Sequence, residues 1–383
     1  MNKNVWIGVA VLIAVIVGVF AVTHYKKASA SEIRLGAILP LTGDVASYGV
    51  AVKQGIDLAV ATENQAGGVK GKAISVMYED DKGDPKQGVT AAQKLISVAH
   101  VRVIIGAVPS SVTLAIAPVA ERARVILFSP ASSSPKITNA GDYIFRNYPS
   151  DELEGQLVAR FAVQHGYSTA ALLTINNDYG NGLNEVFAKA YSEKGGTVLL
   201  NDKYTQGAGD FRTLLLKIKR LSPKCIFIVG YGRELGTIVR QARELAVETQ
   251  FLSTVNFQDA ETIATGGESV DGVRYSSAIF DTQSTEPSVR DFVEAFHKRF
   301  GKDPDVWSAH GYDALRMLVD AMRRRGPDAD SVKQALYATR NFPGVAGRTT
   351  IDENGDPVKE ARFMTVKNRQ FVPYVEPEAP KQR

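Results

Sequence analysis

The stretch VILFSPASSSP, residues 125–135, shows how the chain is built. Its first four residues are apolar and β-prone, as in a strand buried on both faces of a parallel sheet. Three consecutive serines, Ser132–Ser134, come next, before a second proline. Their hydroxyls and the free backbone N–H groups of the next segment can cap a helix or form a neutral cradle for a carboxylate. The residues at the ends of the other strands decide between these two interpretations.

Apolar strand-like runs alternate with amphipathic segments along most of the chain, a pattern typical of parallel sheets with crossover helices. Ile33–Leu39, Ala73–Tyr78 and Val101–Ile105 precede the first stretch as strands, and the pattern starts again near Asn147. The second set of expected strands is Ala170–Ile175, Thr197–Leu200, Cys225–Val229 and Phe251–Val255. We therefore expect an α/β fold of two Rossmann-like, doubly wound lobes with the same plan.

The length and charge of the chain limit the number of domains and the kinds of protein to which it can belong. A chain of 383 residues is too long for one ordinary core, which favours two domains. Its formal net charge is +4, and three of the basic residues, Lys3, Lys26 and Lys27, precede the first acid. The remainder is nearly neutral and lacks the basic surface field that a protein needs to bind nucleic acid. The single cysteine, Cys225, lies in an apolar run and is expected to be buried and unreactive.

Residues 1–30 have the character of a targeting segment. Lys3 precedes the uncharged run Val5–Val22, and Ala28-Ser29-Ala30 has the small-x-small form of a signal-peptidase site. This pattern predicts export. The run also reaches the lower length limit of a membrane span, so the segment is either a cleaved signal peptide or an uncleaved anchor through residues 5–22. Residues 376–383 are expected to form a disordered tail.

Polar and aromatic side chains stand at the strand ends of both expected lobes. In open parallel sheets, ligands bind beyond the carboxyl ends of the strands, where the strand order reverses. Hydroxyls and aromatic rings that converge from two lobes predict a cleft for a small, partly apolar molecule. For Tyr179 and Tyr231 taken singly, a place in the core with only the hydroxyl in water is an equal alternative. The residues expected at these strand ends are Thr42–Tyr48, Ser110, Ser111, Ala131, Ser132, Ser133, Asp178, Tyr179, Tyr231, Val255 and Asn256.

Motifs for catalysis and for metal binding are missing from the sequence. It contains no nucleophile elbow, zinc-protease motif or P-loop, and its five histidines fall singly. The GNG sequence at 180–182 lacks the third glycine of a dinucleotide fingerprint and indicates a tight turn. Asp80, Asp81 and Asp84 stand before Pro85 and are expected to cap a helix rather than to bind a cation. We expect no catalytic residues, no metal and no cofactor, which argues against an enzyme on this fold.

Several of these stretches occur together in one known family. LGAILPLTGDVASYG (residues 35–49), YEDDKGDP (78–85), SPASSSP (129–135), DYGNG (178–182) and GYGRELG (230–236), in this order, resemble the branched-chain amino acid (leucine/isoleucine/valine) binding proteins of bacterial ABC transporters. The resemblance extends from Ile33 to Phe371, and the ordered set is more specific than any one motif. It implies a type I periplasmic solute-binding protein whose lobes close on a ligand and deliver it to the membrane permease.

The resemblance also implies how the chain is divided. Three hinge crossings between the lobes are expected near residues 147, 254 and 358. They assign residues 31–147 and 255–358 to lobe I, and residues 148–254 and 359–375 to lobe II.

Carried over position by position, the resemblance implies roles for the candidate site residues. Ser110 and Ser133, with their backbone N–H groups, would bind the α-carboxylate of the ligand. The carbonyl of Ala131 would accept a hydrogen bond from an α-ammonium group. Tyr231 would lie close to that ammonium. The remaining members of the expected site border the ligand: Tyr48, Ser132 and Tyr179.

One position departs from the family pattern. The amino-acid binders have an acidic residue after the strand that ends at Thr254, where it pairs with the ligand ammonium, and this sequence has Val255. A buried ammonium without a carboxylate partner costs on the order of several kcal/mol. Either another acid takes this place, with Asp178, Glu234 and Asp259 nearest in the sequence, or the ligand is an aromatic or other carboxylate without an ammonium group. A membrane-tethered sensor on the same fold is a further alternative, which requires that residues 5–22 are retained.

Overall fold

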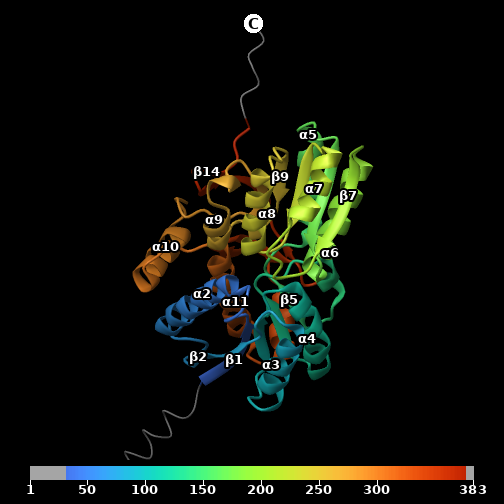
Figure 1. Cartoon of the computed structure of the whole chain (residues 1–383). Helices are drawn as coiled ribbons and strands as arrows, with labels where there is room; N and C mark the ends of the chain where they lie inside the picture. The colour runs from blue at the N-terminus through green and yellow to red at the C-terminus, as the bar shows by residue number, and fades with distance from the viewer. Residues whose placement is uncertain (1–31, 377–383) are drawn as a thin grey trace, which may run out of the picture.

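The computed structural model describes residues 32–376 and shows two α/β lobes, one above the other in Figure 1. The expected signal peptide or anchor in residues 1–30 lies outside the described residues, as does the expected tail beyond residue 376. Within residues 32–376, no helix is both long enough and apolar enough to cross a membrane.

The first lobe, blue to teal in Figure 1, is built on a five-stranded parallel sheet with the order β2-β1-β3-β4-β5. The central strands β3 and β4 are buried along their whole length, because helices cover both faces of the sheet. The bounds are β1 Glu32–Leu39, α2 Ala46–Gln65, β2 Ala73–Asp80, α3 Pro85–Ser97, β3 Val103–Gly106, α4 Ser110–Ala123, β4 Ile126–Ser129, the 3-10 helix η1 Pro135–Asn139 and β5 Ile144–Arg146.

The second lobe repeats this plan. Strands β7-β6-β8-β9-β10 are parallel and have the same order as the first sheet, while β14 and β15 extend the sheet in antiparallel orientation. The repetition confirms the expected α/β fold of two doubly wound lobes. The bounds are α5 Asp151–Gln164, β6 Thr169–Ile175, α6 Asp178–Glu193, β7 Thr197–Tyr204, α7 Arg212–Leu221, β8 Cys225–Val229, α8 Gly232–Glu244, β9 Gln250–Ser253, η2 Val255–Phe257, α9 Ala260–Gly266, η3 Gly267–Val270, β10 Arg274–Ala278, β14 Ala361–Lys367 and β15 Gln370–Pro373.

After β10 the chain returns to the first lobe, where helix α11 packs against α2. Two glycines permit this close approach. A Cβ on Gly55 would lie 2.0 Å from the carbonyl oxygen of Ser308, and a Cβ on Gly311 would lie 2.4 Å from that of Val52. Any side chain at either glycine would therefore push the two helices apart. The bounds of this part are α10 Pro287–Phe300, α11 Val306–Arg325, α12 Ala329–Tyr337, β11 Phe342–Gly344, β12 Gly347–Ile351 and β13 Pro357–Val358.

The place where the chain leaves the second lobe differs from the expectation. Strand β10 pairs with β9 and β14 inside the second sheet, so this crossing lies beyond Ala278 and not near residue 254. Residues 255–278 therefore lie with the second lobe, and the division of the chain expected from the sequence is wrong at this point. The physical reason is that an apolar run predicts a strand but does not specify its sheet, and part of the pairing of β10 is with a strand far along the chain.

The starts of two helices carry candidate site residues. The N-cap position of α4 is Pro109, and Ser110 is its first helical residue. Helix α2 begins at Ala46, so Tyr48 lies in its first turn. Both starts give a polar side chain a well-defined position.

Two expectations about single residues are confirmed. The Asp84 carboxylate caps α3 and accepts hydrogen bonds from the N–H groups of Lys86 and Gln87, each at 2.9 Å. Cys225 is fully buried in β8, and burial raises the pKa of its thiol to about 12. A thiol that keeps its proton at neutral pH is a poor nucleophile, so Cys225 acts as a small apolar residue of the core.

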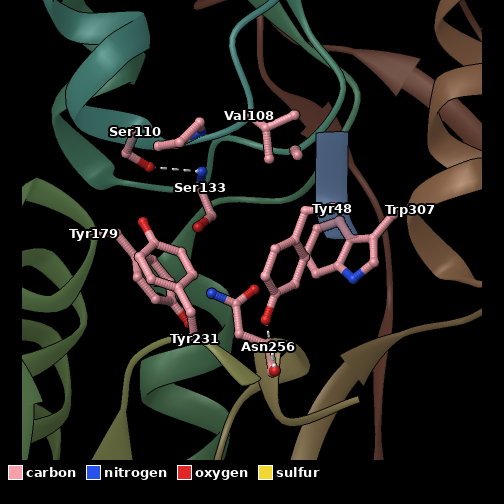
Figure 2. A pocket seen from close by; sticks show the side chains of 10 residues that line it. Tyr48, Val108, Ser110, Ser133, Tyr179, Tyr231, Asn256 and Trp307 are labelled. Atoms are coloured by element: carbon pink, nitrogen blue, oxygen red, sulfur yellow. Dashed lines mark hydrogen bonds between the residues drawn. The ribbon is translucent and has the colours of Figure 1, made fainter. Parts of the chain in front are cut away.

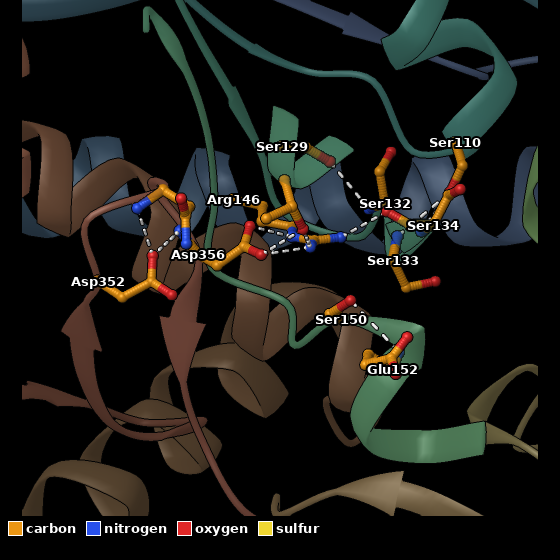
Figure 3. Close-up of polar contacts among 12 residues, drawn as sticks. Ser110, Ser129, Ser132, Ser133, Ser134, Arg146, Ser150, Glu152, Asp352 and Asp356 are labelled. Atoms are coloured by element: carbon orange, nitrogen blue, oxygen red, sulfur yellow. Dashed lines mark hydrogen bonds and ion pairs between the residues drawn. The ribbon is translucent and has the colours of Figure 1, made fainter. Parts of the chain in front are cut away.

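A buried ion pair fixes the end of the first sheet (Figure 3). Arg146, the last residue of β5, is fully buried, and its Nε and Nη2 atoms each lie 2.6 Å from a carboxylate oxygen of Asp356. Its Nη1 donates to the carbonyl of Ser134 at 2.9 Å, and Nη2 lies 2.9 Å from Thr138 Oγ1. The guanidinium group therefore ties the serine stretch to β5 and to the segment that leads into β13.

Replacing Asp356 by Ala should lower the free energy of unfolding by about 3 to 5 kcal/mol, because the buried charge of Arg146 loses its partner. Asp320→Ala is the matched control, since it removes a partly exposed pair with Arg324 at 2.8 Å. The control should cost no more than about 0.5 kcal/mol. Urea unfolding followed by circular dichroism measures both values, and equal losses would contradict the role given to Asp356.

Candidate functional site

A pocket lies between the two lobes, where the strand order reverses in each sheet. The reversal falls between β1 and β3 in the first sheet and between β6 and β8 in the second. The pocket and the solvent-filled space at its mouth together have about 290 Å³ free of protein atoms, and none of the described residues that line it is charged (Figure 2). The lining residues are Tyr48, Val108, Pro109, Ser110, Ala131, Ser133, Tyr179, Tyr231, Asn256 and Trp307.

The serine stretch after β4 forms one wall of the pocket. Ser110 Oγ accepts hydrogen bonds from the backbone N–H groups of Ser133 at 3.2 Å and Ser134 at 3.1 Å (Figure 3). These bonds tie the stretch to the first turn of α4. Ser110 and Ser133 are buried, and both face the pocket (Figure 2). The hydroxyls of Ser110 and Ser133, beside the positive end of α4, make this serine wall favourable for a carboxylate.

The other serines hold the loop and do not line the pocket. Ser129 Oγ donates to the carbonyl of Ala107 at 2.7 Å. Ser132 Oγ lies 3.1 Å from the carbonyl oxygen of Ala107 and 3.0 Å from that of Val108. It also lies 2.7 Å from Thr113 Oγ1. Ser132, which we expected at the ligand, is thus placed outside the lining and instead fixes the loop between β3 and α4.

Four aromatic residues form the opposite side of the pocket (Figure 2). Tyr48 in α2 and Trp307 in α11 come from the first lobe, with ring centroids 5.3 Å apart. Tyr179 in α6 and Tyr231 at the start of α8 come from the second lobe, with centroids 6.0 Å apart. The centroid of Tyr48 lies 5.8 Å from that of Tyr231, so the two pairs form one aromatic wall. This wall suits the apolar part of a small ligand.

The two lobes touch directly beside the pocket. The hydroxyl of Tyr48 accepts a hydrogen bond from the N–H of Gly232 at 2.8 Å and donates to the carbonyl of Asn256 at 3.1 Å. Ser47 Oγ donates to the carboxylate of Asp259 at 3.0 Å. In each case the donor and acceptor belong to different lobes. The structure is therefore a closed arrangement of the lobes.

Of the residues to which the family resemblance gives a place at the ligand, most line the pocket, and Val255 and Ser132 do not. Among the other residues expected at strand ends, Asn256 lines the pocket, whereas Thr42–Ser47, Ser111 and Asp178 do not. Val255 is buried in the short helix η2 and lies outside the lining, where the next residue, Asn256, takes its place. The other exception is Ser132, described above. Contacts of these residues with a ligand stay predictions. The expected residues that the structure brings together in the lining are Tyr48, Ser110, Ala131, Ser133, Tyr179, Tyr231 and Asn256.

Sequence reasoning missed Trp307. This residue lies in the first turn of α11, after the capping residue Asp305, and does not stand at the end of a strand of either sheet. It reaches the pocket because α11 packs against α2, the helix that carries Tyr48. Its one sequence signal is its position at a helix start, which many residues share. Val108 and Pro109 were also missed, although they come directly after β3 and the strand-end rule could have included them.

A buried carboxyl group lies close behind the aromatic wall. Tyr148 stacks on Trp307 with ring centroids 5.5 Å apart, and its hydroxyl donates to Glu154 at 2.8 Å. Burial raises the pKa of Glu154 to about 7, although the hydroxyl of Tyr148 and the N–H of Val255 lower it. No group of three or more His, Cys, Asp or Glu side chains in residues 32–376 is placed to hold a metal ion.

Comparisons with known proteins agree with this geometry. A family model described as periplasmic binding protein matches residues 32–370. Leu/Ile/Val-binding protein homolog 3 from Brucella melitensis is 28% identical over 342 residues, which cover 88% of this chain and 92% of that protein. The structure of a leucine-binding protein, LivK, from Thermotoga maritima has a TM-score of 0.85 and 32% identity, covering 90% of this chain and 98% of that one.

One further neighbour shares the fold alone. It is a solute-binding protein of an ABC transporter from Rhodopseudomonas palustris BisB5, solved in complex with 3,4-dihydroxybenzoic acid. Its TM-score is 0.80 at 24% identity, and the match covers 89% of this chain and 95% of that one.

Replacing Tyr48 by Phe should shift the protein toward an open form, because the variant loses a hydroxyl that makes two hydrogen bonds between the lobes. Each such bond contributes about 0.5 to 1.5 kcal/mol. Tyr204→Phe is the matched control, since it removes a buried hydroxyl that donates to the carbonyl of Val229 at 3.0 Å within the second lobe. Small-angle scattering without ligand should give a larger radius of gyration for Tyr48→Phe alone. An unchanged radius would refute the linking role of Tyr48.

Exchange of Glu154 for Gln should make stability less sensitive to pH. An unfolded glutamate has a pKa of about 4.3, whereas the folded value is about 7. Between these values the folded protein binds more protons than the unfolded chain, so ionisation of Glu154 lowers stability as pH rises. From about pH 5 to about pH 7, the free energy of unfolding of the variant should rise relative to wild type by up to about 2 kcal/mol.

Urea unfolding at several pH values measures this difference. Glu152→Gln, an exposed position on the same helix, serves as the control. A difference between Glu154→Gln and wild type that stays constant over this pH range would contradict the raised pKa of Glu154.

Proposed function

The chain belongs to the periplasmic binding protein family, and from this we propose that it is the solute-binding component of an ABC importer. Its ligand is a small carboxylate, a branched-chain or related amino acid, held between the two lobes. The closed protein delivers this ligand to the permease subunits of the transporter. The family consists of binding proteins, so the chain is a binding protein and not an enzyme.

The observation that carries this proposal is the pairing of the serine wall with the aromatic wall across one closed pocket. Ser110 and Ser133 offer their hydroxyl groups to a carboxylate from the first lobe. Tyr179 and Tyr231 face them from the second lobe. A ligand that touches these serines of the first lobe and these tyrosines of the second stabilises the closed form over any open one, because only the closed form provides both sets of contacts.

The amino-acid ligand is supported by the names of the related proteins. The Brucella melitensis relative is named for binding Leu, Ile and Val, and the Thermotoga maritima structure is named a leucine-binding protein. Both matches cover about nine-tenths of this chain.

The proposed setting is the periplasm. Export is supported by the signal-like features of residues 1–30 and by the family. An uncleaved anchor through residues 5–22 would tether the protein to the inner membrane, either as a transporter component or as a ligand sensor. The mass of the mature protein separates these cases, because loss of the first 30 residues excludes tethering by this segment.

An ammonium-free carboxylate is the second candidate ligand. Val255 stands where an acid is expected, and the described lining residues carry no charge. The Rhodopseudomonas palustris neighbour was solved with 3,4-dihydroxybenzoic acid, although at 24% identity its likeness supports the fold alone. An aromatic carboxylate would satisfy the serine wall and the aromatic wall without needing a negative partner.

Replacing Ser133 by Ala should weaken carboxylate binding by roughly 1 to 3 kcal/mol, the usual value for a lost hydrogen bond to a charged group. The measurement is a thermal-shift screen of the protein from Ser31 onward with leucine, 4-methylpentanoate and benzoate, followed by calorimetric titration. A ligand at a hundred times its dissociation constant adds about 2.7 kcal/mol of stability, which the screen detects.

Leucinamide is the matched control ligand, because it keeps the ammonium and the side chain of leucine but lacks the carboxylate. It should not stabilise the wild-type protein. Stabilisation by none of the carboxylates, or equal affinities of Ser133→Ala and wild type, would overturn the carboxylate site.

A further inference from the structure

A second concave site lies where the later two crossing segments run between the lobes. It is lined by Ile279, by residues 346–348 in the turn from β11 to β12, and by residues 358–360, and we call it the hinge groove. The hinge groove and the solvent-filled space at its mouth together have about 740 Å³ free of protein atoms. It shares no lining residue with the ligand pocket, so it is a separate site.

Both lobes contribute to the hinge groove. Ile279 directly follows β10 and Glu360 directly precedes β14, and these two strands pair in the second sheet. Val358 belongs to β13, which pairs with β12 in the first lobe. The turn from β11 to β12 is also fixed to the first lobe, because Asp313 of α11 accepts two of its N–H groups at 2.8 Å each. A rotation of one lobe relative to the other therefore changes the shape of the hinge groove.

Lys359 brings a positive charge to the hinge groove that the described residues do not neutralise. Its Nζ donates to the carbonyl of Ala346 at 3.1 Å, which is one of the three hydrogen bonds that an ammonium group can donate. Burial lowers the pKa of Lys359 to about 8, although the charge of Asp313 raises it. The amine therefore stays mostly protonated at pH 7. The Asp313 carboxylate is itself occupied by the N–H groups of the turn, so Lys359 has donors free for an anion.

Apolar side chains stand beside this charge. Val358 exposes 61% of its surface and Ile279 exposes 37%, and both line the hinge groove. Exposed apolar side chains gathered in one concave site are typical of a binding surface. Arg348 adds a second positive charge and Glu360 a negative one, so the lining carries one net positive charge. This combination suits a molecule with one negative charge and an apolar part.

We propose that the hinge groove binds a small organic monoanion with its anionic group on Lys359 and its apolar part on Ile279 and Val358. Such a molecule contacts residues that move with each lobe, so it biases the angle between the lobes. The lobes are closed in this structure, and a molecule that fits the groove in this form favours closure. By linkage, closure also raises the affinity of the groove for that molecule. The hinge groove acts in this way whichever ligand the pocket binds.

Calorimetric titration with hexanesulfonate tests the site, because this probe has one negative charge and an apolar tail but no ammonium group. Hexan-1-ol lacks the charge and hexylammonium reverses it, so both should bind wild type roughly 10-fold more weakly or less tightly still. Lys359→Met should weaken binding of hexanesulfonate roughly 10- to 100-fold, the range for a lost interaction with a charged group. Lys302→Met removes an exposed lysine outside the groove and should bind the probe as wild type does.

Val358→Asp is a second variant for the same test. It changes an exposed position, so the fold should tolerate it, and it places a negative charge next to Lys359. It should weaken binding of hexanesulfonate at least as much as Lys359→Met does. The anion site is overturned if wild type does not bind hexanesulfonate, or if both groove variants bind it as wild type does. It is also overturned if Ser133→Ala, in the ligand pocket, is the variant that weakens the probe.

Small-angle scattering without a pocket ligand tests the effect on the lobes. Hexanesulfonate should reduce the radius of gyration of Tyr48→Phe, in which a link between the lobes is removed, and should not do so when Lys359→Met is added. A radius that the bound probe leaves unchanged would overturn the coupling between the hinge groove and closure. Neither measurement uses an amino acid, so failure of the proposed pocket ligand leaves both results interpretable.

Discussion

The buried pair of Arg146 and Asp356 is the constraint on which the site depends. Arg146 ends the first sheet, just before the chain crosses into the second lobe, and Asp356 lies just before the last segment crosses the same way. The same guanidinium group holds the carbonyl of Ser134. The free-energy cost of removing these two charges from water is offset here only because every nitrogen of the guanidinium has an acceptor. The pair therefore specifies geometry, namely the position of the serine wall relative to the crossings, more than it adds net stability.

The position of the pocket is set by strand order. Both sheets place the first strand of the lobe between its second and third, so each has one reversal point at its carboxyl edge. Tyr48 comes after β1, Ser110 after β3, Tyr179 after β6 and Tyr231 after β8. These residues could be predicted because a buried parallel strand is a nearly unbroken apolar run in the sequence. Once the strands are located, their carboxyl ends give the expected position of a ligand site. Two equal reversal points facing each other make a two-walled site.

Features that depend on contacts between distant segments could not be predicted in this way. Trp307 reaches the pocket only because α11 packs against α2. Gly55 and Gly311 permit this close packing, but their presence in the sequence does not predict which helices meet. Because β10 pairs with β14 in the second sheet, the crossing that we expected near residue 254 lies beyond β10. Ser132 and Ser133 are neighbours of the same type, and only the acceptors around them decide which one faces the pocket. In each case the local sequence is compatible with either outcome.

The energetics of closure set the requirement that a ligand has to meet. Tyr48, Ser47 and the Lys136–Asp178 pair join the lobes through contacts between protein groups, which form in the closed state with or without a ligand. A ligand shifts the balance only by the difference in its interaction with the closed and open forms. One that touches the serine wall alone binds both forms equally and leaves the balance unchanged. Recognition and closure are thus coupled, because only a ligand that contacts residues of both lobes at once favours the closed form.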